Sequence, residues 1–349
     1  MFIKKSYLLM VVLAIMAVFA LAGCSSQSSK GEKEEKESAT SKDSNSKYPI
    51  RIKNAFGETV IKSKPKRIVT IQWANQDVAL ALGVVPVGFS AANYGVQDDS
   101  GLLPWTKEKL NELGTKDPNI FHDTDGLDFE AIADAKPDVI LAAYSGITAE
   151  DYETLSQIAP VVAYPTAPWT TTWRDQIKYN SMGMGMEKEG NKLIADTENL
   201  IQDKIKKYPE IKGKKAAFAM FNAKDLSKFY IYTPADPRGG FLKELGMEYP
   251  ASIKKQIKDP NSFYIELSAE NADALNDVEM FIAYGDDNTL KALQTDPILG
   301  KVPAIKNGSV VIIEDNTPLA AAGTPSPLSI QYTIDKYLSL ISDVAKKLK

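Results

Sequence analysis

Cys24 and His122 are the only cysteine and the only histidine among the 349 residues of the chain. One cysteine cannot form an intramolecular disulfide, and one histidine cannot build a metal centre that needs several histidines. His122 lies in the acidic segment IFHDTD with no serine nearby, which predicts a surface loop rather than a nucleophile–base pair. The sequence also lacks Gly-x-Ser-x-Gly, Walker A and dinucleotide-binding motifs. We therefore expect no metal ligands and no catalytic residues.

A glutamate occupies the same position in two similar segments of the chain. Asp128–Ala142 reads DFEAIADAKPDVILA, and Ser268–Ile282 reads SAENADALNDVEMFI. In each segment a capping residue is followed two places later by a glutamate, Glu130 or Glu270, and then by a short helix, a break and a buried strand. Interaction with the helix dipole would explain either glutamate alone. The repeat as a whole predicts two lobes of one architecture.

The elements that must position these residues alternate between strands and helices. Helices interposed between short buried strands are typical of a parallel sheet that is covered on both faces. A hairpin is expected at 48–61 and a terminal amphipathic helix at 327–348. The other expected elements are strands at 68–71, 84–88, 139–143, 161–163, 214–221, 229–233, 279–283 and 309–313, and a helix at 75–82 that ends at Gly83.

The middle of the chain differs from these alternating elements. Residues 171–208 contain no proline, and their apolar positions predict one long helix. The stretch SMGMGM at 181–186 weakens this helix, because each glycine costs about 1 kcal/mol relative to alanine. We expect one long helix, and a kink or a break at these glycines stays open.

The N-terminal residues predict targeting rather than folding. Lys4 and Lys5 precede an apolar run of 15 residues, Tyr7–Leu21, which is shorter than the ~20 residues needed to span a bilayer and is typical of a signal peptide. The run ends in LAGC, which resembles the lipobox of bacterial lipoprotein precursors and implies a lipid anchor on Cys24. An ordinary signal peptide with a stray thiol, or a short membrane anchor, is the alternative. Ser25–Lys47 has Ala39 as its one apolar residue and predicts a disordered tether.

From Ile50 onward the chain resembles the substrate-binding proteins of ABC importers for ferric siderophores and cobalamin. The order and spacing of several motifs carry the resemblance: KPKRIV at 64–69, LALGVVPVG at 80–88, Asp128–Ala142 and FLKELG at 241–246. GLLPW at 101–105, YSGIT at 144–148 and LSQIAP at 155–160 look most like ferric-siderophore members. The resemblance implies the helical-backbone periplasmic-binding-protein fold, in which two α/β lobes with parallel-rich sheets are joined by a single long helix.

The domain boundaries follow from this resemblance. We expect a signal peptide at 1–23, a lipidated cysteine and tether at 24–47, an N-terminal lobe at 48–167, a connecting helix at 168–210 and a C-terminal lobe at 211–349. The implied protein is a monomer without enzymatic activity, anchored to the extracytoplasmic face of the cell membrane. A net charge of −4 at pH 7 also argues against attraction to nucleic acid.

The function implied by the resemblance is capture of a ferric siderophore and its delivery to an ABC permease. Because the siderophore would coordinate the iron, the protein itself needs no cofactor. In family members one exposed glutamate per lobe pairs with arginines of the permease subunits, and Glu130 and Glu270 match those positions. Haem or cobalamin binding by the same architecture stays open, and so does an extracytoplasmic α/β hydrolase. The sequence leaves the chemical class of the siderophore open.

Candidate cleft residues lie where strands run out into loops, the usual binding edge of parallel sheets. Aromatic rings suit the apolar faces of a bulky chelate, and arginine donates several hydrogen bonds while it stays charged. Each aromatic side chain could instead be core packing. The candidates are Trp73, Tyr94, Trp105, Tyr144, Arg174, Tyr232 and Arg238.

Overall fold

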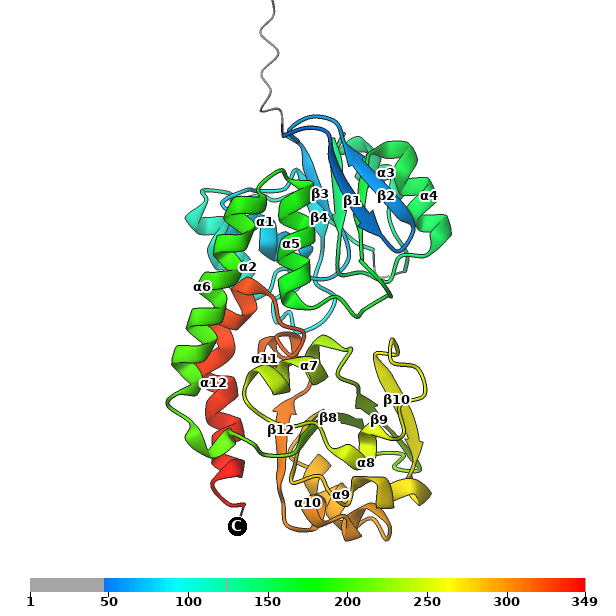
Figure 1. Cartoon of the computed structure of the whole chain (residues 1–349), viewed down its shortest axis with the longest axis vertical. Coiled ribbons are helices and arrows are strands. Elements are labelled where there is room, and N and C mark those ends of the chain that lie inside the picture. The colour runs from blue at the N-terminus through cyan, green and yellow to red at the C-terminus, as the bar shows by residue number, and fades with distance from the viewer. Residues whose placement is uncertain (1–46, 124, 349) are drawn as a thin grey trace, which may run out of the picture. The chain divides into compact units, whose positions relative to one another are not determined.

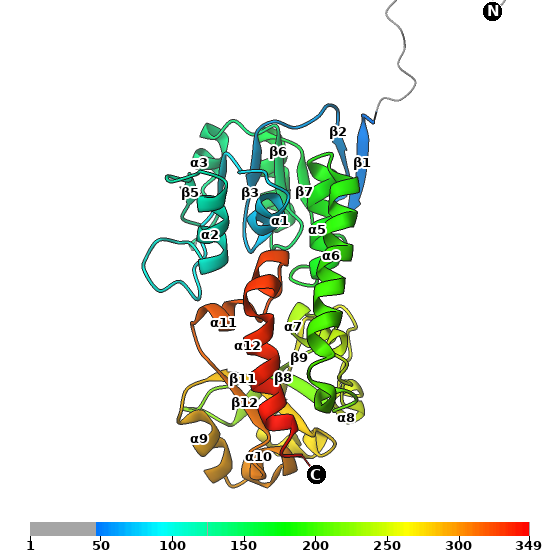
Figure 2. The ribbon, with the colours of Figure 1, turned by 90° about the vertical axis from the view of Figure 1, so that its left-hand side faces the viewer.

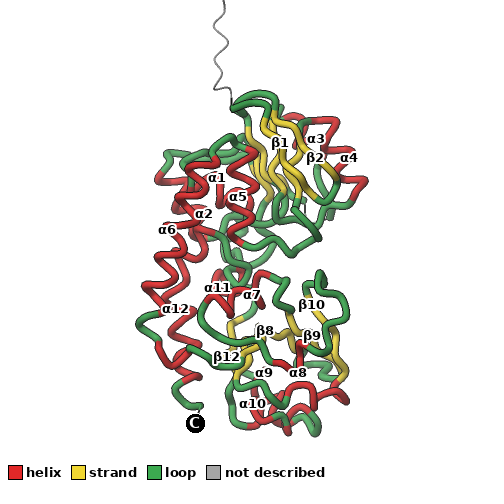
Figure 3. The backbone as a smooth tube through the Cα atoms, viewed as in Figure 1, coloured by secondary structure: helices red, strands yellow, loops and turns green. Residues whose placement is uncertain are grey.

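The computed structural model of the protein describes residues 47–123 and 125–348. These residues form two α/β lobes (Figure 1). The long helix α6 (Glu187–Ile205) extends from one lobe to the other, and the long helix α12 (Pro327–Ala345) runs along the second lobe and contacts the first with its N-terminal end. Each lobe has strands at its centre and helices around them (Figure 3). The predicted signal peptide, Cys24 and the tether up to residue 46 lie outside the described residues.

The first lobe contains a five-stranded parallel sheet in the order β5-β4-β3-β6-β7. Every strand residue except Ile120 is buried, which is why the strands read as short apolar runs. An antiparallel hairpin of β1 and β2 precedes the sheet. The elements are β1 (Ile50–Asn54), β2 (Gly57–Ile61), β3 (Ile68–Thr70), α1 (Asn75–Ala81), β4 (Gly88–Ser90), α2 (Pro104–Glu112), β5 (Ile120–Phe121), α3 (Phe129–Asp134), β6 (Val139–Ala142), α4 (Ala149–Ile158) and β7 (Val161–Ala163).

The second lobe repeats this strand order, as β10-β9-β8-β11-β12. Its sheet is mixed, however, because β9 is antiparallel to β8, and β10 is antiparallel to β9. The elements are η1 (Pro209–Ile211), β8 (Ala216–Phe221), β9 (Lys228–Tyr232), α7 (Pro237–Glu244), α8 (Ala251–Lys254), β10 (Tyr264–Ser268), η2 (Ala269–Leu275), β11 (Met280–Gly285), α9 (Thr289–Thr295), η3 (Leu299–Lys301), α10 (Pro303–Lys306), β12 (Val310–Glu314) and α11 (Pro318–Ala321).

The segment predicted as one long helix forms two helices. α5 (Trp173–Gly183) ends at Met184, the chain turns through Gly185 in the left-handed region at φ 65°, and α6 packs back against α5. A side chain at Gly185 would strike the hydroxyl of Tyr48, so the turn needs a glycine for space as well as for its backbone conformation. The helix that joins the lobes is therefore α6.

The terminal helix α12 lies beside α6 and also contacts both lobes (Figure 2). It begins at Ser326, whose side chain caps the helix and donates a hydrogen bond to Asp77 of α1. Further along, Asp335 pairs with Lys204 at the end of α6. The lobes are thus connected by two packed helices.

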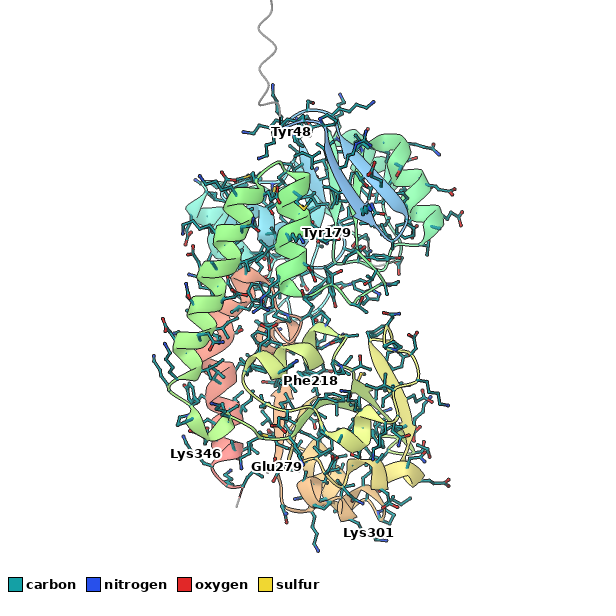
Figure 4. All side chains as sticks on the ribbon, in the orientation of Figure 1. Tyr48, Tyr179, Phe218, Glu279, Lys301 and Lys346 are labelled. Atoms are coloured by element: carbon teal, nitrogen blue, oxygen red, sulfur yellow. The ribbon has the colours of Figure 1, made fainter. Side chains whose placement is uncertain are left out.

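A continuous apolar core passes from one lobe to the other. Buried side chains of the first sheet, of α5, α6 and α12, and of the second sheet belong to one cluster. On β8, Phe218 lies in the second lobe (Figure 4) and packs edge-on against the rings of Tyr232 and Tyr284. The rings that face the ligand cavity described below are thus supported directly by this core.

The expected strands differ from the structure in the bounds of one strand and in the omission of two others. The strand expected at 84–88 begins only at Gly88, since Pro86 has no N–H to donate to a sheet. The structure also contains β5 and β10, which no apolar run predicted. β5 has only two residues, and β10 alternates between exposed and partly buried positions at a sheet edge.

Candidate ligand-binding site

A cavity of about 570 Å³ lies between the two lobes. The first lobe contributes residues that follow the ends of β3, β4, β5, β6 and β7, and the second contributes residues at or just after the ends of β8, β9, β11 and β12. The lining residues are Gln72, Trp73, Ala91, Asn93, Tyr94, Asp123, Tyr144, Trp169, Met220, Phe221, Tyr232, Arg238, Phe263, Tyr284, Gly285, Asp315, Ala320, Ala321 and Thr324. The carboxyl ends of the strands thus face a common space, as expected for α/β sheets.

Arg238 is the cationic group in the wall of this cavity. Its Nε and Nη2 atoms donate to the two carboxylate oxygens of Asp236 at 2.8 and 2.7 Å, and its Cζ lies 3.9 Å from the centroid of the Tyr232 ring. The Arg238 side chain is 17% exposed and that of Asp236 is 0% exposed. Burial lowers the pKa of Arg238, but the charge and hydrogen bonds of Asp236 more than offset this, so the pKa lies well above its ordinary value.

The local sequence explains this pair. Asp236 is the N-cap of α7, with Pro237 at the first helical position, and its carboxylate also accepts a hydrogen bond from the backbone N–H of Arg238 at 2.7 Å. Its role as the N-cap therefore places the Asp236 carboxylate beside the guanidinium of Arg238, two residues later in the chain. No described residue accepts a hydrogen bond from Nη1 of Arg238, which leaves this nitrogen for a ligand.

Tyrosines supply most of the neutral polar groups of the cavity. Burial raises the pKa of Tyr94, Tyr144, Tyr232 and Tyr284, so that each hydroxyl stays protonated at neutral pH. The Tyr284 hydroxyl donates to the carbonyl oxygen of Ala320 at 3.1 Å. The cavity thus combines flat apolar faces with fixed hydroxyl groups.

Trp169, which the sequence did not single out, lines the cavity and has a strained backbone conformation. Its φ is 61°, a value that costs energy for a bulky side chain, and its N–H donates to the carbonyl oxygen of Ser145 at 3.1 Å. The indole packs edge-on against Tyr144, with 5.3 Å between centroids. A Cβ at Gly146 would lie 2.4 Å from the indole Nε1, so the indole can pack here only because residue 146 has no side chain.

A set of hydrogen bonds joins the lobes at one side of the cavity. The Tyr94 hydroxyl donates to Oδ1 of Asp315 at 2.5 Å and accepts from the N–H of Asn316 at 3.1 Å. The N–H of Gly95 donates to Oδ1 of Asn316 at 2.7 Å. The side-chain amide of Gln97 donates to the backbone carbonyl oxygen of Asn316 at 2.8 Å. The loop after β4 and the loop after β12 are therefore fixed to each other.

The structure places five of the seven predicted cleft residues in the cavity wall: Trp73, Tyr94, Tyr144, Tyr232 and Arg238. Trp105 is instead buried in α2, where its indole N–H donates to Oδ2 of Asp77 at 2.9 Å. Arg174 lies outside the cavity because two carboxylates hold its guanidinium. Its Nε donates to Glu198 of α6 at 2.5 Å and its Nη1 to Glu244 of α7 at 2.7 Å.

Several lining residues that the sequence did not suggest fall into two groups. Some follow strands that were misplaced or not predicted, so the rule that ligands bind at strand ends could not reach them. Others lie inside strands predicted as core, where an apolar side chain carries no sign of its direction. The first group is Asn93 and Asp123, and the second is Met220 and Phe221. Phe263 lies just before the unpredicted β10, and Tyr284 lies just after the strand expected at 279–283.

The two matched glutamates lie away from the cavity. Glu130 is exposed in the first turn of α3, which Asp128 caps, and Glu270 is exposed in the first turn of η2, which Ser268 caps. The repeated segments also occupy equivalent places, since β6 and β11 are each the fourth strand of their sheets. The second helix differs from the first in being a 3₁₀ helix.

His122 is exposed, as expected. Within residues 47–123 and 125–348, no group of three or more histidine, cysteine, aspartate or glutamate side chains is arranged to hold a metal ion. None of the helices in that part of the chain has the length and apolar character needed to cross a membrane.

Comparison with known proteins places this geometry among solute receptors. A family described as periplasmic binding protein matches residues 68–317. The crystal structure of PiaA from Streptococcus pneumoniae TIGR4 in complex with ferrichrome is 57% identical, with a TM-score of 0.83, and the match covers 86% of this chain and 100% of that one.

Two curated relatives are more distant. The ferric enterobactin-binding periplasmic protein FepB of Escherichia coli is 27% identical over 291 residues, which cover 77% of this chain and 85% of FepB. The probable siderophore-binding lipoprotein YfiY of Bacillus subtilis is 26% identical over 298 residues, which cover 82% of this chain and 86% of YfiY.

Proposed function

Since the chain belongs to the periplasmic binding protein family, we propose that it is the extracytoplasmic binding component of an ABC importer and that it captures a ferric siderophore between its lobes. The observation that carries the proposal is the similarity to PiaA with ferrichrome, which spans all of that chain at 57% identity. A ferrichrome-like chelate is therefore the first ligand to consider.

The cavity has the chemistry that such a ligand needs. A siderophore supplies all the oxygen ligands of its iron, so the receptor has only to bind the outside of the chelate. Trp73, Tyr144 and Trp169 offer aromatic faces, and Nη1 of Arg238 offers a charged donor to a chelate oxygen. Because Asp236 and Tyr232 hold the guanidinium in place, little conformational entropy is lost when the ligand binds.

Delivery to the permease would use the exposed glutamates. Glu130 and Glu270 lie one on each lobe, at equivalent positions of a repeated fold. A carboxylate paired with an arginine in two hydrogen bonds gives orientation as well as affinity. The proposal therefore assigns these two residues to docking on two permease subunits, and the protein acts as a monomeric receptor rather than as an enzyme.

The proposal includes a lipid anchor on Cys24. It is supported by the sequence LAGC after a short apolar run and by the name of the relative YfiY, a probable lipoprotein. Two acyl chains suffice for stable attachment to a membrane, whereas one does not. Cells fed labelled palmitate should incorporate the label into the wild-type protein and not into Cys24→Ala, and equal incorporation into both would refute the anchor.

A fluorescence titration tests the ligand class. Trp73 and Trp169 line the cavity, so a bound ferric chelate should quench the intrinsic fluorescence of the purified protein. We expect saturable binding of ferrichrome with a nanomolar dissociation constant and no saturable quenching by cyanocobalamin or haem. Free N-acetyltryptophanamide titrated with the same ferric chelate serves as the control for inner-filter effects. Saturable binding of haem or cobalamin without any siderophore response would contradict the proposal.

A further inference from the structure

Two carboxylates, one on each lobe, face the cavity without a cationic partner. Asp123 follows β5 in the first lobe, and Asp315 follows β12 in the second. Neither forms an ion pair with any described lysine, arginine or histidine. Arg238 is the one lysine or arginine among the described residues of the lining, and Asp236 already matches its charge. The wall of the cavity therefore carries an excess of negative charge.

Neutral donors hold both carboxylates in position. The Tyr94 hydroxyl and the N–H of Asn316 donate to Oδ1 of Asp315 at 2.5 and 3.0 Å. The Ser90 hydroxyl donates to Oδ2 of Asp123 at 2.5 Å. These donors fix where the charges lie but do not neutralise them, so a ligand in the cavity meets the field of both groups.

The neighbouring groove does not supply the missing positive charge. A groove of about 450 Å³ adjoins the cavity and shares Asp315 with it. Its two lysines, Lys224 and Lys228, are accompanied by Asp225 and Asp286, and Lys228 also pairs with Glu266 at 3.3 Å. The lysines of the adjoining groove therefore do not offset the excess negative charge of the cavity wall.

The charge of a ferric chelate depends on its donor groups. Three hydroxamates, each with one negative charge, neutralise Fe³⁺, whereas three catecholates with two charges each leave a trianion. Like charges repel, and the repulsion grows where a bound ligand displaces water and so lowers the local dielectric constant. We infer that Asp123 and Asp315 act as a charge filter, which admits neutral or cationic ferric trishydroxamates and disfavours anionic chelates. This inference rests on the proposed function and narrows its substrate class.

Three ligands that differ only in charge test the filter. A linear ferric trishydroxamate with a terminal ammonium group is cationic, its N-acetyl derivative is neutral, and its N-succinyl derivative is anionic, while the iron donors stay the same. The purified full-length protein is titrated with each by fluorescence quenching, at low and at physiological ionic strength. We expect the cationic ligand to bind at least tenfold more tightly than the anionic one at low salt, a difference of about 1.4 kcal/mol. Added salt should reduce this ratio.

Isosteric variants show whether the carboxylates cause the discrimination. In Asp123→Asn/Asp315→Asn the ratio of the dissociation constants for the anionic and the cationic ligand should fall to about twofold. Tyr94 can still donate to the amide oxygen at position 315, so the contact between the lobes is retained. Glu153→Gln removes an exposed carboxylate from α4, away from the cavity, and should leave the ratio unchanged.

The possible results are distinguishable. Equal affinity of the wild-type protein for all three ligands would overturn the filter but leave siderophore capture intact. A ratio that persists in the double variant would also overturn it, because the discrimination would then arise elsewhere. Binding of an anionic ferric siderophore without any trishydroxamate response would overturn the filter and leave siderophore capture intact. Failure of every ferric siderophore to bind would refute the proposed function itself.

Discussion

The buried carboxylate of Asp236 fixes the position of the Arg238 guanidinium in the cavity wall. Asp236 is fully buried and makes two hydrogen bonds with the guanidinium, so neither charge is isolated in the low-dielectric interior. The pair is already formed before a ligand arrives. Ligand binding therefore needs no new desolvation of Asp236, and Nη1 can act on the chelate alone.

Arg238→Met should destabilise the protein, since it leaves the Asp236 carboxylate buried without a partner. Breaking such a pair costs about 3–5 kcal/mol in the free energy of unfolding, which urea denaturation can measure. Asp236→Asn/Arg238→Met should recover most of this stability and still lose ligand affinity. The control is Arg51→Met, which breaks an exposed ion pair with Glu58 and should cost at most about 1 kcal/mol. Equal effects of the two single variants would refute the argument.

Sequence reasoning identified side-chain types more successfully than it identified partners. The rule that ligands bind at strand ends led to Trp73, Tyr144 and Arg238, since the strands before them were predicted closely enough. The rule failed for Trp105, whose partner Asp77 is distant in the sequence. It failed in the same way for Arg174, which is held by the distant Glu198 and Glu244. Only the packing of helices brings those carboxylates within reach.

At the scale of elements, Asp77 joins three helices through one carboxylate. It belongs to α1 and accepts hydrogen bonds from Trp105 and Thr106 of α2, at 2.9 and 3.0 Å, and from Ser326 at the start of α12, at 2.5 Å. Burial raises its pKa to about 6, and the three hydrogen bonds counteract part of that rise. The first lobe is thereby attached to the terminal helix through a group that titrates in the mildly acidic range.

This attachment predicts a specific pH dependence of stability. The pKa of Asp77 is about 6 in the folded protein, against 3.8 ordinarily, so between these pH values the folded state binds more protons. Its contribution to the unfolding free energy is therefore largest below about pH 4 and falls as the pH rises to about 6, by up to about 3 kcal/mol. Urea unfolding of the wild type and of Asp77→Asn across this range should show that difference. A constant difference between the two would contradict the prediction.

Three completely buried strands were predicted closely, whereas β4, which is equally buried, was misplaced. β3, β6 and β7 have every residue buried, so their apolar runs mark them without ambiguity. One long helix was expected where α5 and α6 lie, with a break at the glycines only an open alternative. The reversal of the chain depends on the left-handed Gly185 and on contact with Tyr48, which the sequence pattern does not show. The antiparallel pairing of β9 and β10 left no trace in the residue pattern.

Because the two lobes repeat one fold, each carries one of the two glutamates proposed to dock on the permease. Glu130→Ala/Glu270→Ala should bind the siderophore like the wild type and still reduce uptake of radioactive iron at least tenfold in cells that contain the cognate permease. Each single variant should show a smaller loss, because one pairing remains.

The control for docking is the double variant Glu153→Ala/Glu248→Ala, which removes one exposed carboxylate from each lobe elsewhere. It should transport iron at the wild-type rate. Wild-type uptake by Glu130→Ala/Glu270→Ala would show that docking does not depend on these two residues.

The pairing of α6 with α12 has a consequence for competition at the membrane. Two packed helices resist bending more than one does, since bending would separate contacts on one side and compress them on the other. The spacing between Glu130 and Glu270 would then be nearly the same in empty and loaded receptors. Empty receptors should consequently occupy the transporter almost as well as loaded ones, so the rate of import would depend on the fraction of receptors that carry cargo and not only on their number.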